Sequence, residues 1–185
     1  TNATDKDGDT ALAWAAFNKN PDIADLLIKS GLDVNDQPES STALCVAAEH
    51  NDNPKVISTL IEAGAFVNGA DRIGNTPLYY AVGTNENPEI LFTLVDGGAD
   101  LVKVDESKMM EQLIRACHNE GGCLKDPALV ITKLIKYGAD VNGQNDEGEI
   151  PLIATATYTT DPSVIKVLFD SGANPNIKDD DGNNA

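Results

Sequence analysis

The sequence predicts an all-α solenoid of five helix–turn–helix repeats, joined by short β-hairpin or turn connections. Two recurring patterns predict this class: a glycine phrase that ends each repeat, and an Asx-Pro dipeptide that begins each second helix. One such repeat is too small to bury its own apolar side, so neighbouring repeats must pack together. A single domain covering all 185 residues is therefore expected.

The closing phrase reads most clearly as Gly138-Ala139-Asp140-Val141-Asn142. Its glycines recur at intervals of 33, 34, 40 and 34 residues. Each glycine follows an apolar stretch, at the place where a residue with left-handed backbone ends a helix. The phrase occupies residues 31–35, 64–68, 98–102, 138–142 and 172–176.

The start of each second helix is marked by an Asx residue followed by proline. The Asx side chain accepts a hydrogen bond from a free backbone N–H, and proline fixes a helical φ where no donor is needed. In the first of these helices, spacings of three and four residues place Ile23, Leu26 and Leu27 on one face. The dipeptides are Asn20-Pro21, Asn53-Pro54, Asn87-Pro88, Asp126-Pro127 and Asp161-Pro162.

The first helix of each repeat is short and rich in alanine, and four of them fall at 10–16, 42–48, 76–82 and 150–156. Trp14 follows Leu12 in the first of these and is assigned to the apolar core. Asp-x-x-Gly sequences lie between the repeats. They predict turns, because the Asp side chain bonds its own backbone and Gly accepts positive φ. These turns stand at 5–8, 71–74 and 179–182, with a near match at 145–148.

These motifs resemble the ankyrin repeat family, with its Asp-x-x-Gly-x-Thr-Pro-Leu-x-x-Ala opening and Gly-Ala-Asp-Val-Asn ending. The resemblance spans nearly the whole chain and implies repeats at 5–35, 36–68, 69–102, 103–142 and 143–176. Residues 1–4 read as the end of a preceding repeat and 177–185 as the start of a further one, so an excerpt of a longer array is expected. The histidine that follows Thr-Pro-Leu in the family is absent from this sequence, so the hydrogen-bond network of that tetrapeptide must be altered.

The repeat at 103–142 departs from the pattern. It lacks the turn glycine and the Thr-Pro-Leu phrase, and its loop between the helices is longer. It has six basic and six acidic residues, whereas every other repeat is acidic. Two interpretations stay open: drift in a tolerant surface loop, or a specialised contact site.

The net charge of −17 and the pI of about 4.2 predict repulsion from nucleic acid and from anionic membrane surfaces. They favour a protein partner with a basic surface, bound by a monomer. Three cysteines are too few and too uneven for a disulfide framework, and they favour a reducing compartment such as the cytoplasm. No apolar run approaches the length of a membrane span.

The sequence predicts no catalytic residue, no metal and no cofactor. An EF-hand register set by Gly8 puts Ala3 at the first ligand position and Trp14 at the last, so calcium is not expected. Cys117, His118 and Cys123 supply three nearby candidate ligands, one fewer than a structural zinc site needs.

The resemblance implies that partners bind the concave face, at the hairpin tips and at the polar ends of the first helices. The aligned tips are Lys6, Asp7, Arg72, Ile73, Glu106, Asp146 and Glu147. From the tips and helix ends together, the predicted partner-binding residues are Phe17, His50, Arg72, Ile73, His118 and Tyr158.

The predicted function is a non-catalytic protein–protein interaction module. One alternative is the targeting arm of a larger enzyme or effector whose catalytic domain lies outside this segment. A second alternative is a structural spacer.

Overall fold

The computed structural model describes residues 3–6, 8–36, 41–101, 106–119, 124 and 126–184. Over these ranges the chain is helical, and its one extended pairing is an isolated bridge between Thr4 and Thr10. The chain forms two compact units, Thr1–Val104 and Asp105–Ala185, here called unit 1 and unit 2.

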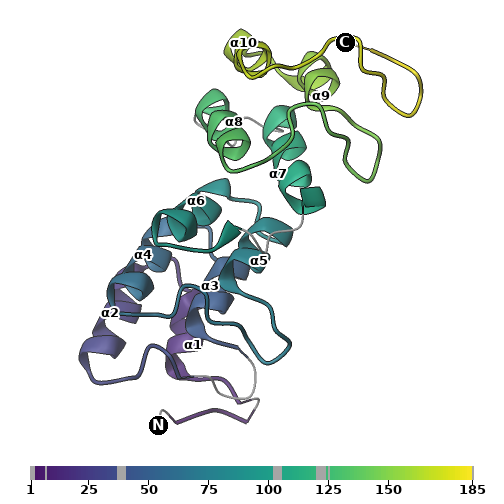
Figure 1. The fold of residues 1–185 in the computed structure, drawn as a ribbon. Coiled ribbons are helices and arrows are strands. Elements are labelled where there is room, and N and C mark those ends of the chain that lie inside the picture. The colour runs from purple at the N-terminus through teal and green to yellow at the C-terminus, as the bar shows by residue number, and fades with distance from the viewer. Residues whose placement is uncertain are drawn as a thin grey trace. The chain divides into compact units, whose positions relative to one another are not determined.

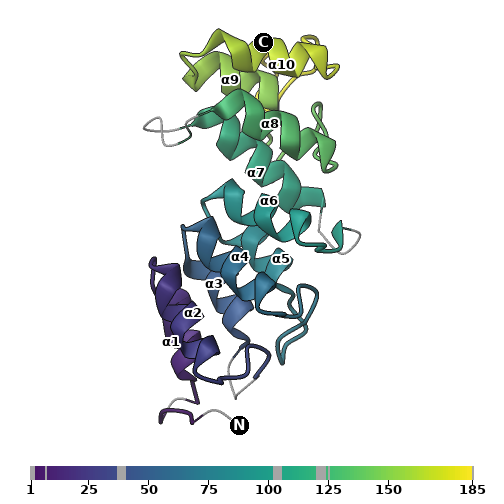
Figure 2. The same ribbon diagram turned by 90° about the vertical axis from the view of Figure 1, so that its left-hand side faces the viewer.

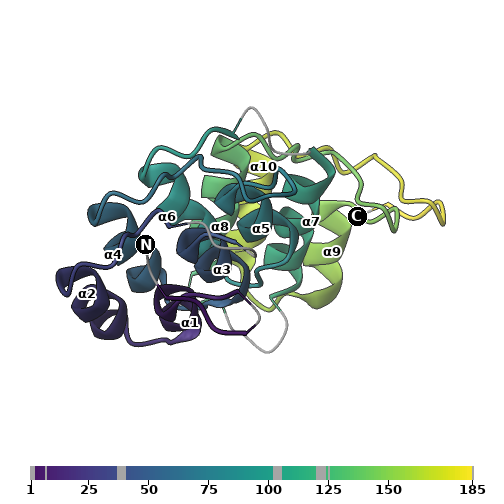
Figure 3. The same cartoon turned by 90° about the horizontal axis from the view of Figure 1, so that it is seen from below.

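Unit 1 contains three helix pairs arranged as two rows (Figure 1). The first helices of the repeats pack in the order α1, α3, α5, and the second helices in the order α2, α4, α6 (Figure 3). The small alanines of the first helices allow this close packing. The helices are α1 (Ala11–Phe17), α2 (Pro21–Lys29), α3 (Ala43–His50), α4 (Pro54–Glu62), α5 (Pro77–Gly83) and α6 (Pro88–Asp96).

Unit 2 contains two helix pairs with the same connections (Figure 2). Helix α7 packs on α8 and α9, and α10 packs on α8 and α9. The helices are α7 (Glu106–His118), α8 (Pro127–Lys136), α9 (Pro151–Tyr158) and α10 (Pro162–Asp170). Each repeat predicted from the sequence thus contains one helix pair.

The predicted helix starts are confirmed at all five Asx-Pro dipeptides. Each Asx is the N-cap residue, and its side chain accepts a backbone N–H of the first turn. Thr10, Thr42 and Thr76 cap α1, α3 and α5 in the same way, each bonding the N–H three residues later.

The predicted helix ends are confirmed as well. The glycines that open the closing phrase, at 31, 64, 98, 138 and 172, all have φ between 92° and 107°. The connections between repeats are hydrogen-bonded turns. In one of them Asp71 Oδ1 accepts the N–H groups of Ile73 and Asn75, at 3.0 and 2.9 Å.

The apolar residues of α2 are buried to different extents. Only Ala24 is fully buried there, Leu27 is half-buried, Ile23 is exposed, and Leu26 is 66% exposed. Leu26 follows Ala24 by two residues, which is about 200° around a helix, so the two side chains leave opposite sides. The face that packs in α4 has a different spacing, with Val56, Ile57 and Leu60 buried.

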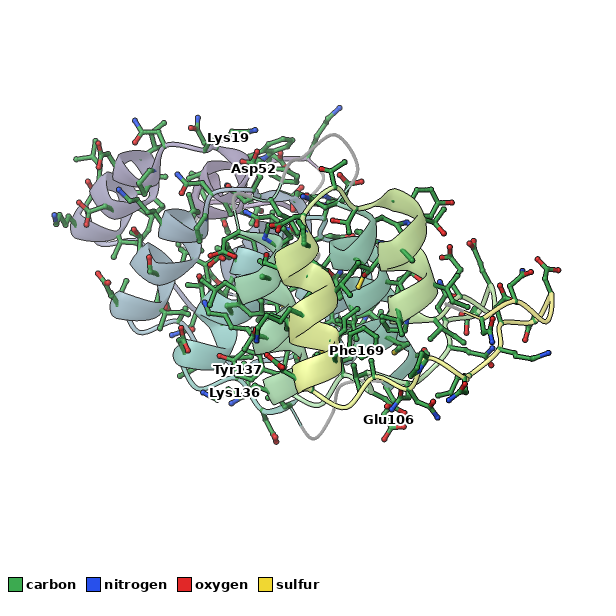
Figure 4. The ribbon with its side chains drawn as sticks, turned by 90° about the horizontal axis from the view of Figure 1, so that it is seen from above. Lys19, Asp52, Glu106, Lys136, Tyr137 and Phe169 are labelled. Carbon is green, nitrogen blue, oxygen red and sulfur yellow. The ribbon has the colours of Figure 1, made fainter. Side chains whose placement is uncertain are left out.

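Glu106 does not lie at a turn tip as predicted. It is the first residue of α7 (Figure 4). An acidic residue in the first turn is stabilised by the positive end of the helix dipole. Asp7, another predicted tip, lies outside the described residues.

Candidate functional site

Phe17 and His50 form a stacked pair of rings in unit 1. Phe17 is the last residue of α1 and His50 the last residue of α3, so the packing of these two helices brings the rings together. The centroids are 4.9 Å apart and the planes are inclined by 17°. Phe17 is 45% exposed, and Glu49 Oε2 lies 3.3 Å from His50 Nε2. The pair therefore presents an aromatic surface beside a carboxylate.

His118 and Tyr158 form the equivalent pair in unit 2. They are the last residues of α7 and α9, and their centroids are 4.4 Å apart. His118 Nε2 lies 3.2 Å from Glu149 Oε1, and Glu149 Oε2 accepts a 3.2 Å hydrogen bond from Asn145. Four of the six predicted binding residues thus form two histidine–aromatic pairs at equivalent helix ends.

Arg72 and Ile73, the other two predicted residues, stand at the tip of the turn before α5. Ile73 is 78% exposed, and Arg72 is exposed as well. The turn precedes the first helix, whereas the ring pairs stand where first helices end. The structure therefore places the four ring residues where first helices end and places Arg72 and Ile73 before the start of α5, so neither belongs to a ring pair.

Trp14 is not in the core, contrary to the sequence prediction. The buried side of α1 consists of Leu12, Ala13, Ala15 and Ala16, while Trp14 is 55% exposed. Trp14 follows Leu12 by two residues, so the same 200° rotation that exposes Leu26 turns the indole away from the core. Its ring lies 5.7 Å from that of Phe17, and its Nε1 donates to Asp5 Oδ2 at 3.0 Å.

The same arrangement holds an aromatic residue in the third repeat. Tyr80 Oη donates to Asp71 Oδ2 at 2.6 Å, and Tyr80 follows Asp71 by nine residues, as Trp14 follows Asp5. Burial raises the pKa of the Tyr80 phenol, and the hydrogen bond to Asp71 raises it further. The turn aspartate therefore both folds the turn and orients an aromatic side chain of the following helix.

The loops that carry the ring pair of unit 1 are joined by buried asparagine side chains. Asn51 is only 1% exposed, and its Nδ2 donates to Ala16 O and Asn18 O at 2.7 and 3.0 Å. Asn85 repeats this one junction later, donating to Ala48 O and Asn51 O, both at 2.9 Å.

Sequence reasoning missed these two asparagines, although a signal was present. The phrase Asn-x-Asn-Pro occupies 18–21, 51–54 and 85–88, so the residue two before each cap is constant in unit 1. The caps take part too: Asn53 Nδ2 donates to Lys19 O and Asn87 Nδ2 to Asp52 O, both at 2.7 Å. An ion pair of 2.5 Å between Lys19 and Asp52 joins the same two loops (Figure 4).

A second row of asparagines links the closing phrases. Asn35 Nδ2 donates to Gly64 O at 2.9 Å, and Asn35 Oδ1 accepts the N–H of Phe66 at 2.8 Å. Asn68 and Asn142 make the same two bonds to the closing phrase that follows each of them. In these three phrases the last residue is thus an asparagine whose amide holds the next repeat in register.

Cys117, near the end of α7, is a core residue. The side chain is fully buried, and burial raises the pKa of its thiol to about 12. His118 turns toward Glu149 instead, and Cys123 lies outside the described residues. Within the ranges that the structure describes, no group of three or more His, Cys, Asp or Glu side chains could hold a metal ion.

None of the described helices has the length and apolar character needed to cross a membrane. The longest, α7, has 13 residues. The loop that distinguishes the divergent repeat, residues 120–123 and 125, lies outside the described residues, so its proposed role as a contact site stays a prediction.

Two layers of paired helices, capped by Asx-Pro and joined by Asx turns, define a helical repeat protein. Models of the ankyrin repeat match residues 7–38 and, as a run of three copies, residues 31–105. The chain belongs to the ankyrin repeat family. Ankyrin repeats are a known protein-interaction module and are generally non-catalytic.

This chain is similar in sequence to ankyrin repeat and SOCS box proteins. Human ankyrin repeat and SOCS box protein 6 is 28% identical over 144 residues, covering 76% of this chain and 31% of that protein. The mouse protein of the same name is 36% identical over 75 residues, covering 40% of this chain and 18% of its own length. This chain thus spans less than a third of these relatives.

The fold is shared with a solved structure, the crystal structure of the human ASB11 ankyrin repeat domain. The TM-score is 0.52 at 23% sequence identity, and the match covers 95% of this chain and 90% of that one. The all-α ankyrin solenoid predicted from the sequence is therefore confirmed.

Proposed function

We propose that this chain binds a protein partner through the turns and the C-terminal ends of its first helices, without catalysing a reaction. The observation that supports this is the pair of histidine–aromatic contacts, Phe17 with His50 and His118 with Tyr158. Each unit presents such a pair at the same place in its repeats. Aromatic side chains that are exposed yet held by neighbours are frequent anchors of protein interfaces.

The turns extend this surface. Ile73 is the most exposed of the large apolar side chains in the described ranges, and the turn that presents it is fixed by the two hydrogen bonds to Asp71. A preorganised apolar side chain loses little conformational entropy on binding. The net charge of −17 favours a partner with a basic surface over nucleic acid or an anionic membrane, and a monomer is expected.

Site-specific photo-crosslinking tests the location of the binding surface. A photoreactive phenylalanine analogue is placed at position 17, 73 or 158, and at the exposed positions 26, 66 and 169 as controls. The proposal expects one protein to be crosslinked from the first set in cell extract and not from the second. Crosslinks that arise only from positions 26, 66 and 169 would contradict it, as would equal labelling from all six.

We propose further that the array is the recognition part of a larger protein. The match covers 31% of the human relative, whose name gives a SOCS box as well as ankyrin repeats. This keeps open the alternative of a targeting arm for an enzyme or effector. Immunoblotting of the natural protein tests it: a mass well above 19.5 kDa is expected, and a product of that mass would contradict the idea.

A further inference from the structure

Three exposed rings lie side by side in unit 1, and we call Trp14, Phe17 and His50 the ring row. The Trp14 and Phe17 centroids are 5.7 Å apart, and those of Phe17 and His50 are 4.9 Å apart. Single exposed apolar side chains are ordinary on protein surfaces, but contiguous ones mark interaction sites. The ring row therefore requires an explanation that the fold alone does not supply.

Carboxylates stand at both ends of the ring row. Asp5 Oδ2 accepts the Trp14 Nε1 proton at 3.0 Å, which orients the indole, and Glu49 Oε2 is 3.3 Å from His50 Nε2. Unit 1 has 16 acidic and 6 basic residues, a net charge of −10. Both the local groups and the field of the whole unit favour a cation over these rings.

We propose that the ring row receives the guanidinium group of an arginine in a basic segment of the protein partner. This inference rests on the proposed function and names the chemistry of its partner. A guanidinium is planar, stays charged, and stacks on aromatic faces, of which tryptophan is the most favourable. Nucleobases also stack on such rings, but the charge of unit 1 repels their phosphates.

The ring pair of unit 2 is not suited to the same ligand. The residue three positions before Phe17 is Trp14, whereas the residue three positions before His118 is Arg115. Arg115 is a cation on the same helix, and its Nη2 lies 3.6 Å from Glu111 Oε1. The arginine of the partner is therefore assigned to unit 1 alone.

The test compares two short peptides, acetyl-Gly-Arg-Gly-Arg-Gly-amide and the same peptide with citrulline, the uncharged isostere, in place of arginine. Trp14 is the only tryptophan of the chain, so its fluorescence reports binding at the ring row directly. Calorimetry gives the dissociation constants. The arginine peptide is expected to bind about tenfold more tightly than the citrulline peptide.

Phe17→Ala is the informative variant, and Phe66→Ala is its matched control. Both remove an exposed phenylalanine of unit 1 without changing the charge, and Phe66 is 70% exposed and outside the ring row. The first is expected to weaken arginine-peptide binding about fivefold and the second to leave it unchanged. Circular dichroism confirms that both variants remain folded.

Three results would overturn the inference: no binding at millimolar peptide, equal affinity for both peptides, or equal affinity of the two variants. Equal affinity for the peptides would indicate an uncharged anchor, and equal affinity of the variants would indicate diffuse charge attraction. In each case crosslinking from position 17 to a protein partner would leave the proposed function standing. Crosslinks confined to positions 26, 66 and 169 would contradict the proposed function, regardless of the peptide-binding results.

Discussion

In unit 1, each loop between two helices of a repeat is joined to the preceding repeat by three hydrogen bonds that asparagine side-chain amides donate. Asn51 and Asn53 make them at one junction, and Asn85 and Asn87 at the next. In unit 2 the corresponding positions of the last loop hold Thr159 and Asp161. Thr159 accepts the N–H of Asp161 at 3.2 Å, as Asn51 accepts that of Asn53, but neither side chain has an amide to donate.

This difference shows that two residues that cap their helices in the same way can differ in whether they bind the preceding repeat. Asn53 and Asp161 cap their helices alike, each accepting the N–H two residues later. Only the asparagine also binds the preceding repeat. The closing phrase behaves otherwise, since Asn35, Asn68 and Asn142 make the same paired bonds in both units.

The largest expected effect comes from Asn51→Ala. The change leaves two carbonyl oxygens and one N–H of the loop without their buried partner, which should cost about 3 kcal/mol of unfolding free energy. Urea unfolding followed by circular dichroism measures it. Thr159→Ala, the matched change in unit 2, should cost about 0.5 kcal/mol because one local bond is lost. Similar costs for the two variants would show that the loops of both units are equally coupled.

Gly64→Ala and Gly172→Ala should each lower the free energy of unfolding by about 1–2 kcal/mol, and the two losses should be equal. The two glycines have φ of +92° and +94°, and nothing lies within 4 Å of an added Cβ at either. The penalty is therefore backbone strain alone and does not depend on the unit. Thermal unfolding of both variants measures it, and a cost confined to one unit would show that packing also contributes.

Asn53→Asp isolates the donated bond from the cap. Aspartate caps a helix as well as asparagine does, so the expected loss of about 1 kcal/mol comes from the bond to Lys19 O. Asn20→Asp is the control, because Asn20 is exposed and its Oδ1 caps α2, the second helix of the first pair. Its stability should change by less than about 0.5 kcal/mol. Equal losses in urea unfolding would assign the effect to capping.

The smallest effect concerns pH. Hydrogen bonds from Ser163, through its side chain first and then its backbone N–H, hold the pKa of the exposed Asp161 carboxyl below its usual range. Because the folded pKa is the lower one, this contribution is present above the unfolded pKa of about 3.9 and is lost as pH falls through the folded value. Asp161→Asn should flatten the loss of thermal stability in acid. An unchanged acid profile would show that the cap of α10 does not contribute to it.

The helix boundaries were predictable from sequence because they depend on residues close together in the chain. Caps at Asn20 or Thr42 and the left-handed Gly64 involve contacts within four or five positions. The assignment of Trp14 to the core is wrong because Trp14 follows the buried Leu12 by two positions, which places its side chain on the opposite side of α1. The angular position on the helix, and not apolar character alone, decides which side chain faces the neighbouring helix.

The candidate site shows the same division. Phe17, His50, His118 and Tyr158 could be placed at helix ends from the repeat alone, but their ring contacts join residues more than thirty positions apart. The asparagine bonds between repeats span similar separations, as from Asn51 to Ala16. Local hydrogen bonds and backbone sterics follow from neighbouring residue types. Which rings meet, and which amides are buried, depends on how one helix pair packs against the next.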